Sequence, residues 1–112
     1  MKKTNNLFDL QDKVALITGG AGLLAAEHAL ALHEFGAKII LADISLEKAQ
    51  TVINNLKNEN CDVDFIVCDV TSKSSWEQAL EFILKKHNKI DILINNAGFT
   101  NQSKSANFDA LR

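Results

Sequence analysis

The sequence predicts one α/β domain with a parallel, doubly wound sheet, and three observations support this. Short continuous apolar runs alternate with longer segments of helical period. The apolar runs contain few polar residues, which is typical of parallel strands that helices cover on both faces. A glycine-rich turn follows the first apolar run. With 112 residues, the chain is long enough for one domain only.

Four apolar runs are the expected strands, and they span residues 14–17, 39–42, 63–67 and 90–94. Right-handed crossovers and a switch after the third strand predict the spatial order 3-2-1-4. Asp64 interrupts the third run, which suits a strand at the edge of the sheet. The fourth run has the apolar character of an interior strand, but no later segment could supply a fifth strand beside it. We therefore expect a truncated form of the fold, with about four strands.

Three segments between these runs have helical periodicity, and their ends carry capping signals. The first helix is expected over residues 23–35, and Gly36 follows it where a helix often ends on a glycine with positive φ. Ser45 can cap the second helix. Ser74, with Glu77 three residues later, has the form of a capping box for the third helix.

Composition and charge exclude several classes of function. The formal net charge of −2 leaves no basic footprint for nucleic acid. Neither a signal peptide nor an apolar run of transmembrane length is recognisable, which predicts a cytoplasmic protein that does not bind a membrane. Cys61 and Cys68 have neither zinc nor redox spacing, so we expect structural thiols. His28 and His33 are five residues apart on a helix, which does not place them on one face, so no metal site is expected.

The glycine-rich turn, TGGAGLLA at residues 18–25, fits a dinucleotide-binding pattern in one register. Gly20, Gly22 and Ala25 match G-x-G-x-x-G/A, in which backbone N–H groups and a helix N-terminus hold a pyrophosphate. In a second pattern, T-G-x-x-x-G-x-G, glycines are expected where Leu23 and Ala25 stand. By itself, the turn is also compatible with an ordinary connection between a strand and a helix.

Asp43 strengthens the dinucleotide interpretation because it ends the second strand. It follows Gly20 by about 20 residues, the separation at which an acidic residue accepts hydrogen bonds from the adenosine ribose hydroxyls. A carboxylate there would repel a 2′-phosphate, and neither Ile44 nor Ser45 offers a compensating positive charge. The sequence therefore predicts NAD rather than NADP as cofactor. The alternative is an aspartate that serves only a turn or a helix N-cap.

Four motifs occur in a fixed order: DKVALITGGAGLL, LAD, CDV and IDILINNAG. Together they resemble the N-terminal half of the short-chain dehydrogenase/reductase family, from about Leu7 to Gly98. The resemblance implies a Rossmann fold that binds NAD(H) or NADP(H). It also implies hydride transfer to or from a carbonyl or alcohol substrate.

The resemblance assigns a role to each motif. The turn from Gly19 to Leu24 would hold the pyrophosphate, and Asp43 the adenosine ribose. Asp69 and Val70 would border the adenine, while Asn95 and its neighbours would lie near the nicotinamide ribose. The expected cofactor-binding residues are Gly19, Gly20, Gly22, Leu23, Leu24, Asp43, Asp69, Val70, Asn95, Ala97 and Gly98.

The family's catalytic residue is a tyrosine in a Y-x-x-x-K arrangement, whereas this sequence contains no tyrosine. No catalytic residue is therefore assigned. We expect a single, incomplete NAD-binding domain, with a lead-in at residues 1–12, a βαβαβαβ core at 13–98 and a polar tail at 99–112. The sequence then represents the cofactor-binding part of a short-chain oxidoreductase, inactive alone.

Two alternatives remain open. One is a non-catalytic NAD-binding or interaction module that associates with itself through the exposed fourth strand, because an uncovered apolar edge strand invites pairing. The other is a methyltransferase-type domain, which also places an acidic residue after the second strand. That type of domain has no role for NNAG.

Overall fold

A computed structural model describes residues 9–96, except for the side chain of Leu23. The expected tail from residue 99, and the lead-in before residue 9, lie outside the described residues. The elements alternate as expected. In order they are β1 (Val14–Thr18), α2 (Leu23–Glu34), β2 (Lys38–Asp43), α3 (Leu46–Asn58), β3 (Val63–Val67), α4 (Lys73–His87) and β4 (Ile92–Asn95).

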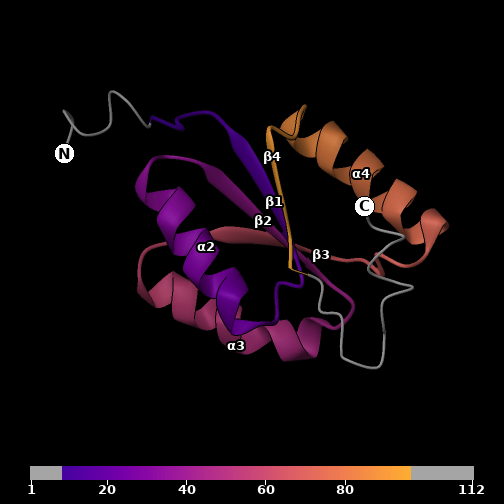
Figure 1. Cartoon of the computed structure of the whole chain (residues 1–112), viewed down its shortest axis with the longest axis horizontal. Coiled ribbons are helices and arrows are strands. Elements are labelled where there is room, and N and C mark those ends of the chain that lie inside the picture. The colour runs from indigo at the N-terminus through magenta and orange to yellow at the C-terminus, as the bar shows by residue number, and fades with distance from the viewer. Residues whose placement is uncertain (1–8, 97–112) are drawn as a thin grey trace.

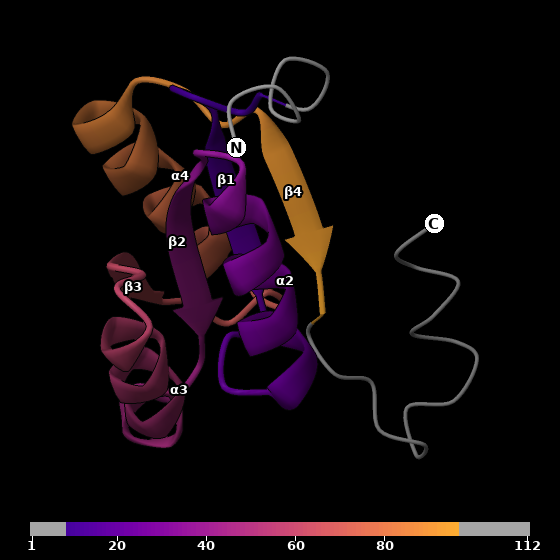
Figure 2. The same cartoon turned by 90° about the vertical axis from the view of Figure 1, so that its left-hand side faces the viewer.

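The four strands form one parallel sheet in the order β3-β2-β1-β4, which confirms the predicted topology. In the register, Leu16 of β1 lies between Ile40 of β2 and Leu93 of β4. Figure 2 shows β4 beside β1. The strand with the interrupting Asp64 lies at the opposite edge, as its composition indicates.

Helices cover both faces of the sheet, with α2 and α3 on one side and α4 on the other (Figure 1). Side chains along β1 alternate between the two faces. Ala15 and Ile17 join the apolar cluster formed with α2 and α3, and Val14 and Leu16 join the cluster formed with α4. Burial on both faces explains why β1 is an unbroken apolar run.

The ends of α2 and α3 carry the expected signals. Gly36, directly after the C-cap of α2, has φ of +103°, a conformation that favours glycine. Ser45 caps α3, and its hydroxyl oxygen accepts a hydrogen bond from the Lys48 N–H at 3.1 Å. Both capping predictions are confirmed.

The predicted capping box of α4 is wrong. Ser72, not Ser74, is the N-cap, and its Oγ accepts from the Ser75 N–H at 3.2 Å. Ser74 lies within the helix, and Glu77 pairs with Lys73 at 3.0 Å instead. A turn before the helix explains the difference, because the Ser72 N–H donates to the Asp69 carbonyl and places Ser72 at the helix start.

The fourth strand begins at Ile92 rather than at Ile90. Asp91, which precedes it, accepts a hydrogen bond from the Val14 N–H through Oδ2 at 2.8 Å. This bond lowers the pKa of the Asp91 carboxyl. The side chain thereby replaces part of the regular strand pairing where β1 and β4 begin.

Asp64 connects edge strand β3 to the end of α4. Its Oδ2 lies 3.0 Å from Lys86 Nζ and 2.7 Å from His87 Nε2. Partial burial opposes ionisation of Asp64, but the hydrogen bonds and positive charges of these two residues outweigh it, so its pKa is lowered.

We expect Asp64→Asn to reduce stability at neutral pH and to flatten the acid limb of the pH–stability curve. A lowered pKa means that the stabilisation is present above the unfolded value, about 3.9, and is lost as the pH falls through the folded value. The side chain is 34% exposed, which limits the effect to below about 1 kcal/mol. Urea unfolding between pH 7 and pH 2 measures it.

Asp62→Asn is the matched control, because Asp62 is an exposed carboxylate immediately before the same strand. It should leave the curve nearly unchanged. An equal effect of the two substitutions would contradict a specific contribution from the contacts with Lys86 and His87.

Within residues 9–96, the helices are too short or too polar to cross a lipid bilayer.

Candidate cofactor-binding site

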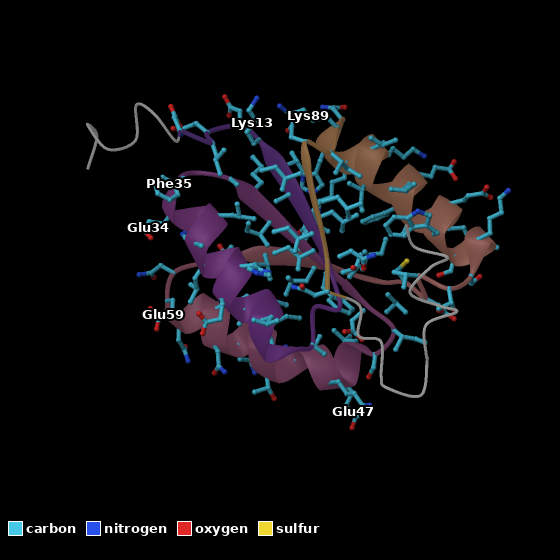
Figure 3. The ribbon with its side chains drawn as sticks, in the orientation of Figure 1. Lys13, Glu34, Phe35, Glu47, Glu59 and Lys89 are labelled. Carbon is cyan, nitrogen blue, oxygen red and sulfur yellow. The ribbon has the colours of Figure 1, made fainter. Side chains whose placement is uncertain are left out.

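The predicted site residues within residues 9–96 lie where the parallel strands end. Figure 3 shows Lys13 and Lys89, which precede β1 and β4, at one end of the sheet, and Glu47, in the first turn of α3, at the other. Asp43 and Asn95 are the last residues of β2 and β4, so they share the end marked by Glu47. In open α/β sheets, ligands bind at this carboxyl edge.

The glycine-rich turn requires glycine at two positions. Gly19 has φ of +71°, in the left-handed region that favours glycine. A Cβ on Gly20 would lie 2.9 Å from Leu41 Cβ, closer than carbon atoms can approach. Gly22 is under neither constraint, since the nearest atom to its Cβ position is 3.5 Å away. The turn is therefore shaped by contact with β2.

The Asp43 side chain accepts hydrogen bonds from the turn and from the start of α3. Its Oδ2 accepts a hydrogen bond from the Ala21 N–H at 2.9 Å, and its Oδ1 accepts from the Ser45 N–H at 3.2 Å. The Gly20 N–H donates to the Ala42 carbonyl at 2.9 Å. The end of β2 and the turn after β1 thus form one hydrogen-bonded unit.

The N-terminus of α2 differs from those of α3 and α4. Ser45 and Ser72 cap α3 and α4, whereas Gly22 is the N-cap of α2 and provides no side-chain hydrogen bond. The first N–H groups of a helix have no partner within the helix, and they lie at the positive end of its dipole. A pyrophosphate would satisfy these groups at α2, beginning with those of Leu23 and Leu24.

Ala25 occupies the last small-residue position of the G-x-G-x-x-G/A pattern. It is fully buried in the cluster between the sheet and α2. This is the position whose small side chain permits close packing of helix on strand, so alanine fulfils the role here.

The end of β3 lies beside the end of β2, because the Cys68 N–H donates to the Asp43 carbonyl at 2.9 Å. Asp69 follows, but its carboxylate turns onto its own loop and accepts from the Thr71 Oγ1 at 2.6 Å and N–H at 3.0 Å. Hydrogen bonds from the side chain and then the backbone of Thr71 lower the pKa of Asp69. Val70 packs against the α4 side of the core.

The end of β4 is joined to the end of β1. Thr18 Oγ1 donates to Asn95 Oδ1 at 2.7 Å, and the Asn96 N–H donates to the Thr18 carbonyl at 3.1 Å. Thr18 is buried, so this pairing satisfies a polar group within the sheet. Ala97 and Gly98, the last two predicted site residues, lie outside the described residues.

Sequence reasoning missed a link between α2 and the end of β4. Asn96 Nδ2 donates to His28 Nδ1 at 3.0 Å. An amide nitrogen can only donate, so the ring nitrogen of His28 is the acceptor in this contact. No local pattern could reveal this contact, because it joins residues 68 positions apart.

We expect His28→Ala to lower the free energy of unfolding by about 1 kcal/mol, because a partly buried amide loses its acceptor. His33→Ala on the same helix is the control, since none of the side-chain hydrogen bonds found within residues 9–96 involves His33. Urea titration measures both variants. Equal stability of His28→Ala and the unmodified chain would show that the contact contributes nothing.

A cavity lies away from the predicted site, where β2 and β3 begin. It measures about 380 Å³ and is lined in part by His33, Asp62, Asp64 and His87. Across residues 9–96, no group of three or more His, Cys, Asp or Glu side chains is arranged to hold a metal ion. The residues that line the cavity include none of the predicted cofactor-binding residues.

Comparison with known proteins agrees with this geometry. The family model described as short chain dehydrogenase matches residues 13–111. A 7alpha-hydroxysteroid dehydrogenase from Bacteroides fragilis is 33% identical over 101 residues, which cover 90% of this chain and 39% of that protein. A (+)-borneol dehydrogenase 1 from Salvia officinalis is 34% identical over 101 residues, covering 90% and 38% of the two chains.

Solved structures have the same fold. A 2-keto-3-deoxy-D-gluconate dehydrogenase from Streptococcus agalactiae superimposes with a TM-score of 0.82 at 30% identity, covering 98% of this chain and 43% of that chain. A xylitol dehydrogenase with bound NAD+ gives a TM-score of 0.74 at 29% identity, with 91% and 41% covered. The chain thus spans about two fifths of the length of these relatives. With a family model that matches nearly all of its described residues, the chain belongs to the short-chain dehydrogenase family.

Proposed function

We propose that this chain is the NAD-binding part of an oxidoreductase that transfers hydride to or from a carbonyl or alcohol. The observation that carries the proposal is the Asp43 carboxylate at the end of β2, hydrogen-bonded to the glycine-rich turn at 2.9 Å. The turn and the acidic residue that the cofactor requires are thus parts of one site. Family membership supports the reaction class.

The geometry supports a distinct place for each part of NAD. The N–H groups of Gly20 and Ala21 already have acceptors in β2, so the pyrophosphate would bind the first turn of α2. The ribose hydroxyls would donate to the outward lone pairs of Asp43, since a carboxylate accepts more bonds than the two it has here. Asp69 and Val70 would border the adenine. The nicotinamide ribose would lie towards Asn95.

Charge and exposure favour NAD over NADP. A 2′-phosphate would lie beside the Asp43 carboxylate, and like charges at close range repel. Ile44, the next residue, is 63% exposed and has no charge to compensate. One relative of solved structure contains NAD+, which agrees with this preference.

This chain's own residues bind and orient the cofactor. When bound, the nicotinamide supplies the hydride acceptor or donor. The family's proton-transferring residue is a tyrosine, and the sequence contains none. We therefore expect binding by the 112-residue chain without turnover.

Calorimetric titration of the purified chain with NAD and NADP tests the proposal. NAD should bind about tenfold more tightly, or better, because of repulsion between Asp43 and the 2′-phosphate. Equal or tighter binding of NADP would contradict the preference. Failure of both dinucleotides to bind at millimolar concentration would overturn the proposed function. NADH formation with any of a panel of alcohols would contradict the absence of turnover.

A second candidate function, an interaction module, is favoured by one observation. Leu93 of edge strand β4 is 54% exposed, and no described strand pairs with the outer side of β4. Such an edge can pair with another chain. Sedimentation velocity of the chain and of Leu93→Lys tests this: a dimer that the substitution dissociates would support the module, and a monomer at all concentrations would exclude self-association.

A further inference from the structure

The Asp43 side chain reaches from the end of β2 to the turn that follows β1. We propose that Asp43 is also the positioning residue of the glycine-rich turn, so that its hydrogen-bond acceptor orders the turn while its charge selects the cofactor. The part that concerns the cofactor rests on the proposed function. The part that concerns the turn does not.

One backbone contact and one side-chain contact connect the glycine-rich turn to β2. The Gly20 N–H is held by the Ala42 carbonyl, whatever residue stands at position 43. The Ala21 N–H is held by Asp43 Oδ2 at 2.9 Å and so depends on that side chain. One residue later, Gly22 is the N-cap of α2. Along the chain, the hydrogen bond to Asp43 therefore lies between the hydrogen bond from Gly20 to Ala42 and the helix N-terminus that would bind the pyrophosphate.

The turn needs such a restraint because of its composition. Gly19, Gly20 and Gly22 surround Ala21, and glycine has more backbone freedom than any other residue. Position 19 already occupies the left-handed region. Without the carboxylate, the Ala21 N–H must find water, and the segment gains conformations that do not present the N-terminus of α2 correctly.

Two substitutions separate the acceptor from the charge. In Asp43→Asn, the amide oxygen can still accept from the Ala21 N–H, but the charge is lost and the amide NH2 faces the Ser45 N–H. Asp43→Ala removes both the acceptor and the charge. If Asp43 only selected the cofactor, the two variants would bind NADP with equal affinity.

Amide hydrogen exchange, measured by NMR on the cofactor-free chain, tests the positioning role directly. We expect the protection of the Ala21 amide, relative to that of Leu16 in β1, to fall by about tenfold or more in Asp43→Ala, as the loss of a charged hydrogen bond implies. Asp43→Asn should retain most of this ratio. Asp62→Ala, an exposed carboxylate before β3, is the control and should retain all of it.

The Leu16 reference separates local from global effects, because an unfolded variant loses protection at both amides. Asp43→Ser serves as a second variant if Asp43→Ala does not fold, since its shorter hydroxyl cannot replace Oδ2. An unchanged ratio in a folded variant that lacks the acceptor would overturn the positioning role.

Dinucleotide titration provides the second test. Asp43→Asn should bind NAD and NADP about equally, whereas Asp43→Ala should bind both at least about tenfold more weakly than Asp43→Asn does. Tighter NADP binding by Asp43→Ala than by Asp43→Asn would contradict the proposal. If no form of the chain binds either dinucleotide, the proposed function fails, while the exchange result still decides the positioning role.

Discussion

Replacing Gly20 with alanine is expected to destabilise the domain and displace the glycine-rich turn from β2. The new Cβ would lie 2.9 Å from Leu41 Cβ, which belongs to a fully buried side chain near its attachment to the backbone. Neither atom can move without moving a strand or the turn. Overpacking of this kind costs about 1–3 kcal/mol. Denaturant unfolding gives the loss of stability.

Gly22→Ala is the matched control, because it adds the same methyl group to the same turn. The nearest atom to that Cβ position is 3.5 Å away, an ordinary contact, and Gly22 has φ of −90°. Stability should therefore change by less than about 0.5 kcal/mol. Similar losses in the two variants would show that the turn does not press against β2 at Gly20.

Truncating Ile83 to alanine should have the largest effect on stability. Ile83 lies on α4, is 0% exposed, and packs in the cluster that covers the second face of the sheet. Removal of such a side chain costs about 2–5 kcal/mol, the sum of lost transfer energy and the cavity left behind. For a domain of this size, with a total stability of about 5–15 kcal/mol, the loss is severe. Thermal and urea unfolding measure it.

The adjacent residue provides the control. Leu84 is on the same helix but is 47% exposed, so Leu84→Ala removes a similar volume mostly from water. Its cost should stay below about 1 kcal/mol. Equal destabilisation of the two variants would show that α4 does not pack on the sheet with Ile83 facing the core.

The Gly20 and Ile83 variants together distinguish an effect on cofactor binding from an effect on stability. Both substitutions weaken the fold, but only Gly20 lies in the turn that would hold the cofactor. At a temperature where both variants remain folded, we expect Gly20→Ala to weaken NAD binding and Ile83→Ala to leave it nearly unchanged. NAD titration at that temperature makes the comparison, and equal weakening would indicate that the site responds to stability alone.

The sequence predicted the end of α2 and the start of α3 correctly, but not the start of α4. Ser45 and Gly36 were identified because each stands alone at the end of a clear periodic segment. At α4, the spacing of Ser74 and Glu77 predicted the wrong N-cap, because Ser72 caps the helix. The start of α4 depends on the hydrogen bond that the Ser72 N–H makes to the Asp69 carbonyl, which the local pattern does not reveal.

The sequence predicts candidate residues for the site but not the hydrogen bonds between them. Gly20, Gly22 and Asp43 match a spacing that dinucleotide-binding turns share, whereas a role for Gly19 is implied only by the family resemblance. The bond from Ala21 to Asp43, and the one from Asn96 to His28, were not predicted. Each depends on the relative placement of two elements, which periodicity does not specify.

The sequence alone determined the order of strands and helices, the parallel sheet and the residues at its carboxyl edge. Apolar periodicity and handed crossovers are local or topological properties, so they can be read along the chain. Only the tertiary structure decided that Asp43 accepts a hydrogen bond from Ala21, that Gly20 packs against Leu41, and that His28 contacts Asn96. These contacts depend on how strands and helices are placed relative to one another, and that placement is set by all the side chains packed between them.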